Sequence, residues 1–485
     1  MFKQIAHIAQ NLKAPLKTQS HIVTGWVKSV RNLKNVMFVD LYDGQQTMKL
    51  VIPKNAGAAS STSLSTGACV QLQNFEIVPR VKDMGFELKT VKESILKTIG
   101  PITEDYPLQK KQTSVGFLRS WPQYKYNTNY LSSLMKFRSI VENEFAKSLQ
   151  KSDFINVHAP IITGSDCEGA GEMFSLEAEK DYFKDNAQPY LTVSTQLHLE
   201  ILAQSLGRVY NISPCFRAEK SDTNRHLTEF WMLEAELCFI EDITELCRVS
   251  ESMIKDVIRS LYENYNESDI LPKYRPVGAT KTSSELQTAG PALNNTSEIR
   301  ANWANLLSKD WQILEYTKVV EILQEKLKVS PSFFKYNNIK WGDELQSEHE
   351  KWLASSYCGN SPVFVVNYPA SIKPFYMKQN VEACNYNGVE LGKTVANFDL
   401  LVPGMGEIIG GSLREHNYQT LLGTIKERNM NGENLEWYVD LRKNGSAPHG
   451  GFGLGLERFV SYLFGNGSIK DAIPFFRTAG SSIKT

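Results

Sequence analysis

Two apolar, strand-like runs near the middle of the chain enclose a charged segment. Residues 209–212 (VYNI) and 231–233 (WML) carry the apolar pattern that is typical of β-strands. The polar residues 220–224 (KSDTN) between them have the composition of a loop. The pattern therefore predicts a β-hairpin that ends in a charged loop.

Charged side chains of this hairpin stand where apolar residues surround them. Arg217, Glu219 and Glu229 have apolar neighbours in the sequence, and a buried charge needs a partner. Arginines such as Arg225 bind phosphates through paired hydrogen bonds, and Phe230 offers an aromatic face to a base. The hairpin thus predicts a site for a nucleoside triphosphate, with a solvated, charge-decorated hairpin as the alternative.

A glycine-rich segment, residues 450–455, precedes a helical pattern near the C-terminal end. The spacing of Phe459, Val460, Leu463 and Phe464 predicts a helix, so we expect the glycines at the passage from a strand into that helix. Small residues let the backbone approach a ligand, and Arg458 falls in the first turn of the helix. The segment matches neither common phosphate-loop spacing.

Apolar periodicity predicts further elements on both sides of the hairpin. A helix is expected over residues 316–327, and another carries five apolar positions before a strand-like run at residues 154–160. Three strands are expected near the N-terminus, at residues 22–27, 37–44 and 48–52. The five apolar positions of the second helix are Leu134, Phe137, Val141, Phe145 and Leu149.

Composition and charge describe a globular chain with a basic N-terminal part. The 485 residues are 42% hydrophobic and 22% charged, and no apolar run is long enough to cross a bilayer, so we expect no membrane partner. The net charge is zero, yet residues 1–120 hold 16 Lys and Arg against 8 Asp and Glu. This surplus suits contact with a nucleic-acid backbone, although a solvated surface is the alternative.

Cysteine spacing and the first twenty residues bear on the compartment. The seven cysteines show neither paired nor metal-type spacing, which predicts free thiols in a reducing compartment and no zinc. Lys3, Lys13 and Lys17 precede the first acidic residue, Asp40, along an amphipathic stripe. Residues 1–20 therefore predict either a mitochondrial targeting segment or an N-terminal arm of the following domain. The expected location is the mitochondrial matrix, with the cytoplasm as the alternative.

Taken together, these elements resemble the three signature motifs of the class II aminoacyl-tRNA synthetases. The hairpin around Arg217 is similar to motif 2, the segment around Arg458 to motif 3, and the helix and strand before Pro160 to motif 1. The resemblance extends from about residue 21 to about residue 477. It implies an α+β fold in which an N-terminal OB-fold β-barrel precedes a catalytic domain with an antiparallel sheet and surrounding helices.

The resemblance also implies boundaries for these domains and a use for each. Residues 21–100 would form the anticodon-binding OB-fold of the aspartyl, asparaginyl and lysyl subclass, and residues 101–120 a hinge. Residues 121–485 would form the catalytic domain, with an insertion around residues 265–355. Such barrels stack bases on aromatic side chains beside cations, so Arg31, Phe38 and Lys49 are the expected anticodon contacts. A core position for Phe38 is equally compatible with the pattern.

Three local features resemble the asparaginyl members of the family. The run at residues 165–174 is similar to their mobile loop, and the run at residues 194–200 to the strand and helix of their amino-acid pocket. Leu199 stands where aspartyl enzymes have a lysine that neutralises the substrate carboxylate. The third feature is the run at residues 399–414. A neutral amide needs only an acceptor and a donor, for which Glu200 and Arg414 are the expected groups.

The resemblance assigns roles to individual side chains. ATP would be bound by Arg217, Glu219, Arg225, His226, Phe230, Glu407 and Arg458, of which Arg217, Glu219 and Arg458 would be catalytic. Asparagine would be bound by Glu168, Ser194, Gln196, Glu200 and Arg414. Mg²⁺ would be held by Asp399 and Glu407, since this ion takes few protein oxygens and shares phosphate oxygens.

The implied reaction joins asparagine to tRNA(Asn) through an asparaginyl-adenylate, in a homodimer built on the motif 1 helix and strand. Three alternatives stay open on the sequence. One is an aspartyl enzyme that does not discriminate between two tRNAs, which Leu199 disfavours. The others are an amide synthetase on the same catalytic domain, which the OB-fold disfavours, and a non-catalytic RNA-binding paralogue, which the full set of arginines and carboxylates disfavours.

Overall fold

The computed structural model describes most of the chain. The described residues are 5–7, 14–54, 64–80, 85–109, 113–164, 173–179, 182–184, 188–220, 223–272, 275–276, 295–386, 389–430 and 435–483. The chain divides into two compact units, Met1–Asn127 and Thr128–Thr485. The first is an all-β barrel followed by a short helix, α2 (Val115–Arg119), and the second combines a large sheet with helices. The expected α+β fold is confirmed.

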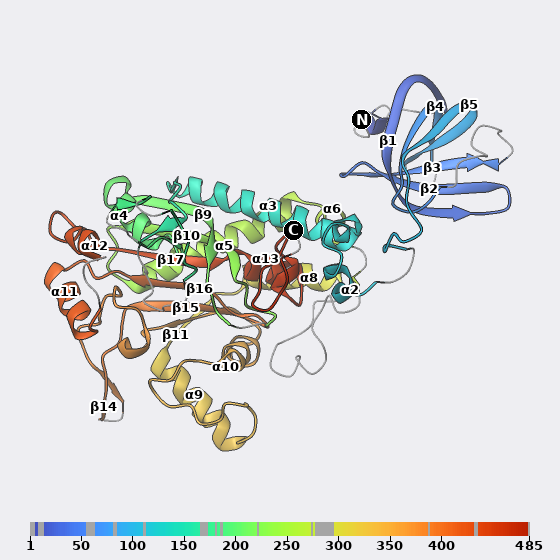
Figure 1. Ribbon diagram of the computed structural model, residues 1–485. Helices are drawn as coiled ribbons and strands as arrows, with labels where there is room; N and C mark the ends of the chain where they lie inside the picture. The colour runs from blue at the N-terminus through green and yellow to red at the C-terminus, as the bar shows by residue number, and fades with distance from the viewer. Residues whose placement is uncertain are drawn as a thin grey trace. The chain divides into compact units, whose positions relative to one another are not determined.

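The described strands of the first unit close into a barrel in the order β1-β2-β3-β5-β4 (Figure 1). Alternate residues such as Val39, Leu41 and Leu50 fill its interior, which is the period-two pattern of a strand with one buried face. The strands are β1 (Leu16–Asn32), β2 (Val36–Tyr42), β3 (Thr47–Pro53), β4 (Cys69–Pro79) and β5 (Phe86–Gly100).

The barrel extends further toward the N-terminus than the sequence indicates. Strand β1 begins at Leu16 rather than near residue 21, and its first residues pair with β4. Ile5 is also buried within the barrel core. Part of the stretch expected to be an arm or a targeting segment therefore belongs to the folded barrel.

The second unit is built on a mainly antiparallel sheet of eight described strands. The order is β11-β12-β15-β16-β17-β10-β9-β6, and only the outer pairs β11–β12 and β6–β9 are parallel among these strands. The strands are β6 (Ile155–Asn156), β9 (Arg208–Phe216), β10 (Glu229–Cys238), β11 (Gln312–Glu315), β12 (Val363–Val366), β15 (Asn397–Val402), β16 (Gly406–Leu413) and β17 (His449–Gly455). The expected hairpin is the β9–β10 pair, in which Phe216 lies opposite Glu229.

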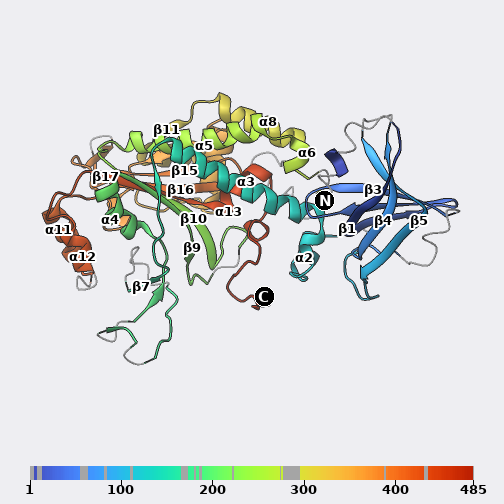
Figure 2. The same ribbon diagram turned by 90° about the horizontal axis from the view of Figure 1, so that it is seen from above.

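Long helices cover one face of this sheet (Figure 2). Helix α5 (Ile243–Asn264) contacts β15, β16 and β17, and α3 (Asn129–Lys151) and α8 (Thr296–Ser308) pack against α5. The five apolar positions predicted for α3 are all buried, which confirms that helix. The remaining α-helices in the described part of the chain are α4 (Gln196–Leu206), α6 (Glu267–Ile270), α9 (Tyr316–Val329), α10 (Ser347–Trp352), α11 (Tyr418–Glu427), α12 (Glu436–Asp440) and α13 (Leu456–Phe464).

Three expectations differ from the structure in detail. The strand predicted over residues 154–160 is only two residues long, and most of the glycines of residues 450–455 lie inside β17 rather than at its end. The stretch around residues 265–355 supplies β11, which pairs with β12 and so joins the main sheet.

Small strand pairs flank the sheet: β7 (Ile162–Thr163) with β8 (Tyr190–Leu191), and β13 (Cys384–Tyr386) with β14 (Val389–Gly392). Within the described residues, every helix is too short or too polar to cross a bilayer.

Candidate active site

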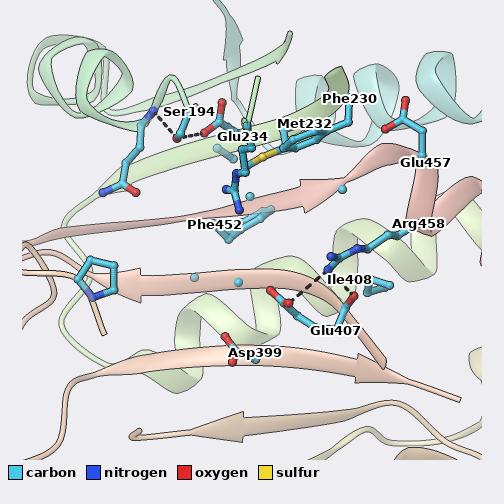
Figure 3. A pocket seen from close by; sticks show the side chains of 18 of the residues that line it. Ser194, Phe230, Met232, Glu234, Asp399, Glu407, Ile408, Phe452, Glu457 and Arg458 are labelled. Atoms are coloured by element: carbon cyan, nitrogen blue, oxygen red, sulfur yellow. Dashed lines mark hydrogen bonds and ion pairs between the residues drawn. The ribbon is translucent and has the colours of Figure 1, made fainter. Parts of the chain in front are cut away.

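A cavity of about 310 Å³ opens over the middle strands β10, β16 and β17. Its lining includes residues of these strands, of the segment between β9 and β10 and of the start of α13, so segments far apart in sequence meet there (Figure 3). Glycine is required in β17 at Gly451, where a Cβ would lie 1.9 Å from Glu236 Oε2 and 2.3 Å from the Ala235 carbonyl oxygen. The close approach of β17 to β10 therefore explains the glycine-rich sequence.

The hairpin residues predicted to bind a nucleotide all line this cavity. They are Arg217, Glu219, Arg225, His226 and Phe230. The Arg217 guanidinium lies 5.5 Å from the centre of the Phe230 ring, so a cation and an aromatic face are presented side by side. Burial lowers the pKa of His226, and nearby arginines act in the same direction while Glu219 opposes them. This end of the cavity suits an anion flanked by a flat ring.

Helix α10 holds Arg225 from outside the hairpin, a contact that the sequence did not suggest. Arg225 donates to Ser347 Oγ, and its Nη2 lies 3.3 Å from Glu350 Oε2. The Glu407 backbone N–H also donates to Glu350 Oε2, at 3.2 Å. Burial raises the pKa of Glu350, although Arg225 opposes that shift. The arginine is therefore positioned by a carboxylate that lies about 125 residues further along the chain.

Two carboxylates face the cavity from neighbouring strands, Asp399 on β15 and Glu407 on β16 (Figure 3). A Cβ on Gly410 would lie 3.4 Å from Glu407 Oε1 and 3.7 Å from Asp399 Oδ1, so this glycine leaves space between them. Lys373 Nζ lies 2.9 Å from Asp399, and Arg458 Nη1 lies 3.2 Å from Glu407. Burial raises the pKa of Asp399. Burial would also raise the pKa of Glu407, but Arg458, Lys373 and Arg225 hold it below its usual value. Two hard oxygen ligands beside an open space fit Mg²⁺.

The opposite end of the cavity carries uncharged and acidic groups around Ser194. Ser194 Oγ donates to Glu234, and the Thr195 backbone N–H donates to the same carboxylate at 2.9 Å (Figure 3). Gln196 lines the cavity and donates from Nε2 to Glu200 at 3.0 Å. Glu234 was missed by the sequence interpretation, although Glu234 and Glu236 alternate on one face of β10 and both line the cavity.

Arg414 also lines this end, and its hydrogen bonds to a carboxylate go to Glu236, while Glu200 lies further away, at 3.9 Å. Arg414 donates from Nη2 and Nε to the two Glu236 oxygens, at 2.9 and 3.1 Å. Glu200 is fully buried and is not among the described residues that line the cavity. Leu199, the position expected to exclude a lysine, lines the cavity and is itself buried. The structure thus places Glu236 and Arg414 at the pocket wall and Glu200 behind it.

Other predicted contacts lie elsewhere. Glu168 falls outside the described residues. Arg31, Phe38 and Lys49 lie on β1, β2 and β3, where Arg31 pairs with Phe38 and Lys49 with Asp40, so the three share one face of the barrel. Their neighbours Val39 and Met48 point into the core, while Phe38 is half-buried on the outer side. An aromatic ring between two cations on one surface suits single-stranded nucleic acid.

Comparisons with known proteins agree with this geometry. Residues 121–479 match the family model described as tRNA synthetases class II (D, K and N). The chain is 48% identical to a mitochondrial asparagine–tRNA ligase of Saccharomyces cerevisiae, over 95% of this chain and 92% of that protein. It is 36% identical to asparaginyl-tRNA synthetase of Homo sapiens, over 94% and 89% of the two chains.

A solved structure gives the same result for the fold. The crystal structure of asparaginyl-tRNA synthetase from Pyrococcus horikoshii, complexed with asparaginyl-adenylate, aligns with a TM-score of 0.77 and 29% identity, over 96% of each chain. The family model covers well over half of the sequence, and its range includes every described residue that lines the cavity. The chain therefore belongs to the class II tRNA synthetases of the aspartyl, lysyl and asparaginyl type.

Proposed function

We infer that this protein is an asparagine–tRNA ligase, which activates asparagine with ATP and transfers it to tRNA(Asn). The observation that carries this conclusion is the Arg414–Glu236 pair at the wall beside Leu199, because it offers both a donor and an acceptor to a side-chain amide. Aspartate would bring an unpaired negative charge to a wall that already carries a carboxylate.

The experiment that tests this function is ATP–pyrophosphate exchange driven by asparagine and by aspartate separately. Exchange that depends on asparagine, followed by charging of tRNA(Asn), is the expected result. Exchange driven equally well by aspartate would favour an aspartyl enzyme that does not discriminate between tRNAs. A failure of both amino acids would favour the non-catalytic paralogue.

For the first step, we propose that the asparagine carboxylate attacks the α-phosphorus of ATP and pyrophosphate leaves. Arg217 would hold the α-phosphate and Glu219 would orient the nucleotide. Arg225 and His226 would bind the β- and γ-phosphates, and Phe230 and Arg458 would enclose the adenine. Their common position around one cavity supports these roles. The rate would come from placing the reactants and from stabilising phosphate charge, without an obligatory general base.

Asp399 and Glu407 would hold Mg²⁺, which supplies charge neutralisation to the phosphates when it is bound. The open space at Gly410 supports this role. Lys373 is placed to neutralise Asp399 when the ion is not bound. Ser194, Gln196 and Glu168 would seat the α-ammonium and α-carboxylate of asparagine, with Glu234 holding Ser194. In the second step the 3′-hydroxyl of the tRNA attacks the acyl carbon of the adenylate, and AMP leaves.

The barrel would bind the anticodon through Arg31, Phe38 and Lys49, and residues 101–120 would act as a hinge. We also propose a homodimer formed through α3 and the strand that follows it. Strand β6 is one edge of the described sheet, and Ile155 in β6 and Ile161 and Ile162 after it are exposed. An open edge with exposed isoleucines suits pairing with a second copy. Light scattering during gel filtration should give twice the mass of the chain.

Localisation in the mitochondrial matrix is supported by relatives named as mitochondrial in yeast and in Dictyostelium discoideum. Because Ile5 packs into the barrel core, we propose that the N-terminal segment is kept after import. Cell fractionation, with N-terminal sequencing of the protein recovered from mitochondria, tests both points. A cytoplasmic pool alone would contradict the localisation.

A further inference from the structure

A second layer of buried charges lies directly behind the amino-acid end of the cavity. Its centre is Glu200, and its other members are Tyr438, Arg442 and His449, all of which are buried. Arg442 Nη2 donates to Glu200 Oε2, and Tyr438 Oη donates to the Glu200 carboxylate at 2.9 Å. His449 Nε2 lies 3.0 Å from Glu200 Oε2, so this nitrogen carries a proton toward the carboxylate.

This arrangement keeps Glu200 ionised inside the protein. Burial alone would raise the pKa of Glu200, but Arg442, His449 and Arg414 together hold it well below its usual value. Arg442 is itself fixed, since its Nε donates to the Glu415 carbonyl oxygen at 3.0 Å and its Nη2 to Tyr438 Oη at 2.8 Å. The negative charge of Glu200 is therefore a permanent part of the site.

Two of the groups that line the cavity are in contact with this charge. Gln196 Nε2 donates to Glu200 Oε1 at 3.0 Å, and Arg414 Nε lies 3.9 Å from the same oxygen. Arg414 is thus held between two carboxylates, Glu236 at the wall and Glu200 behind it. Its Nη1 donates to Ser412 Oγ at 2.7 Å, which directs the guanidinium plane.

We propose that Glu200 is a positioning residue that sets amino-acid specificity through Arg414 and Gln196, without touching the substrate. Two guanidinium groups, Arg414 and Arg442, face two carboxylates, Glu200 and Glu236, so their charges balance. A neutral amide leaves that balance intact, whereas an aspartate side chain adds a third negative charge. The proposal rests on the function inferred above, because it explains how the same pocket discriminates asparagine from aspartate.

Removing only the charge of Glu200 should reverse part of this preference. In Glu200→Gln, two guanidinium groups face one carboxylate, so the pocket gains one positive charge that an aspartate side chain can neutralise. The side chain keeps its length and an oxygen that accepts from Arg442 or Tyr438. In a buried site, a unit charge as close to the pocket as that of Glu200 changes the affinity for a charged substrate by more than about tenfold.

The test measures kcat/KM for asparagine and for aspartate in ATP–pyrophosphate exchange. In Glu200→Gln the asparagine-to-aspartate ratio should fall by about tenfold or more, through a higher KM for asparagine and a gain with aspartate. Glu200→Asp keeps the charge and should retain most of the selectivity. The matched control Tyr438→Phe removes a hydroxyl that donates to Glu200 without changing charge, and its ratio should stay within about threefold of wild type.

If Glu200→Gln alone unfolds, Arg442→Gln takes its place, because it adds one net negative charge behind the wall and should raise the asparagine-to-aspartate ratio about tenfold or more. The double variant Glu200→Gln/Arg442→Gln removes one charge of each sign. Its ratio should return toward the wild-type value. A purely structural role would lower exchange with both amino acids alike, and an unchanged ratio in Glu200→Gln overturns the proposal. If the wild-type protein failed to use asparagine at all, the inferred function would be wrong instead, so the two failures are distinguishable.

Discussion

Glu457 and Arg138 form a buried ion pair across 319 residues of sequence, with 2.6 Å between Glu457 Oε1 and Arg138 Nη1. The second oxygen of Glu457 accepts the Trp231 backbone N–H at 3.0 Å. One carboxylate therefore joins α3, β10 and α13, which carry the motif 1, motif 2 and motif 3 residues. Because Glu457 precedes Arg458 in the first turn of α13, this pair also orients the start of the helix that presents Arg458 to the cavity.

Arg138→Met should destabilise the larger unit by about 3 kcal/mol, because it leaves the buried Glu457 without its cation. Urea denaturation followed by tryptophan fluorescence measures the change. Glu142→Gln is the matched control, since it breaks the other, partly exposed ion pair of Arg138 and should cost about 1 kcal/mol or less. Equal effects of the two substitutions would contradict a specific role for the buried pair.

Arg217→Ala should reduce asparagine-dependent ATP–pyrophosphate exchange by roughly 100-fold or more, because a charge-assisted contact with the reacting phosphate is lost. The exchange rate at saturating ATP is the measurement. Arg208→Ala, at the exposed start of β9, the strand that precedes Arg217, serves as the control and should retain wild-type exchange. Near wild-type exchange in Arg217→Ala would remove the hairpin from the proposed mechanism.

Leu199→Lys should weaken the use of asparagine and admit aspartate, because a cation would enter the cavity wall where Leu199 now lies. The measurement is amino-acid-dependent exchange with each substrate in turn. Leu199→Met keeps the size and apolar character of the side chain and should leave the preference for asparagine unchanged. An unaltered preference in Leu199→Lys would mean that the amino-acid pocket lies elsewhere.

Phe38→Ala should weaken binding of tRNA(Asn) by about 1–3 kcal/mol, since a stacking surface on the barrel is removed. The KM for tRNA should rise about tenfold or more, while ATP–pyrophosphate exchange without tRNA stays at its wild-type rate. Ile95→Ala removes another exposed apolar side chain of the barrel, outside the face formed by Arg31, Phe38 and Lys49, and is the control. A matching loss in both variants would indicate general damage to the barrel.

Iodoacetamide labelling should report the raised pKa of two buried cysteines, Cys238 and Cys358. Burial, with Glu236 and Glu200 nearby, raises the pKa of the Cys238 thiol to about 11, and burial raises that of Cys358 to about 11. Since only the thiolate reacts, both should label slowly in the native protein at pH 8 and faster as pH rises toward 11. Mass spectrometry of peptides, with urea-unfolded protein as reference, provides the rates. Fast native labelling at pH 8 would contradict this prediction.

Much of the fold was predictable because local periodicity and burial agree along these elements. The apolar stripes at residues 134–149 and 316–327 became α3 and α9, and the apolar runs at residues 209–212 and 231–233 became parts of β9 and β10. The length of strand β6 was overestimated. An apolar run near the edge of a sheet has the sequence pattern of a strand even where its backbone does not pair with a neighbouring strand. The addition of β11 to the sheet was not predictable from local sequence, because parallel pairing joins segments about 50 residues apart.

The sequence by itself predicted a nucleoside triphosphate beside Arg217 and Arg225, since residue type and spacing indicate cations that can face a phosphate. Only the tertiary structure decided which acidic side chain stands beside Arg414. Glu200 and Glu236 are chemically alike, and their order along the chain does not show which one faces the cavity. Arg442, brought from 242 residues away, binds Glu200 behind the wall and leaves Glu236 at its surface. The direction of a buried carboxylate depends on partners from distant segments, because no charge stays buried without one.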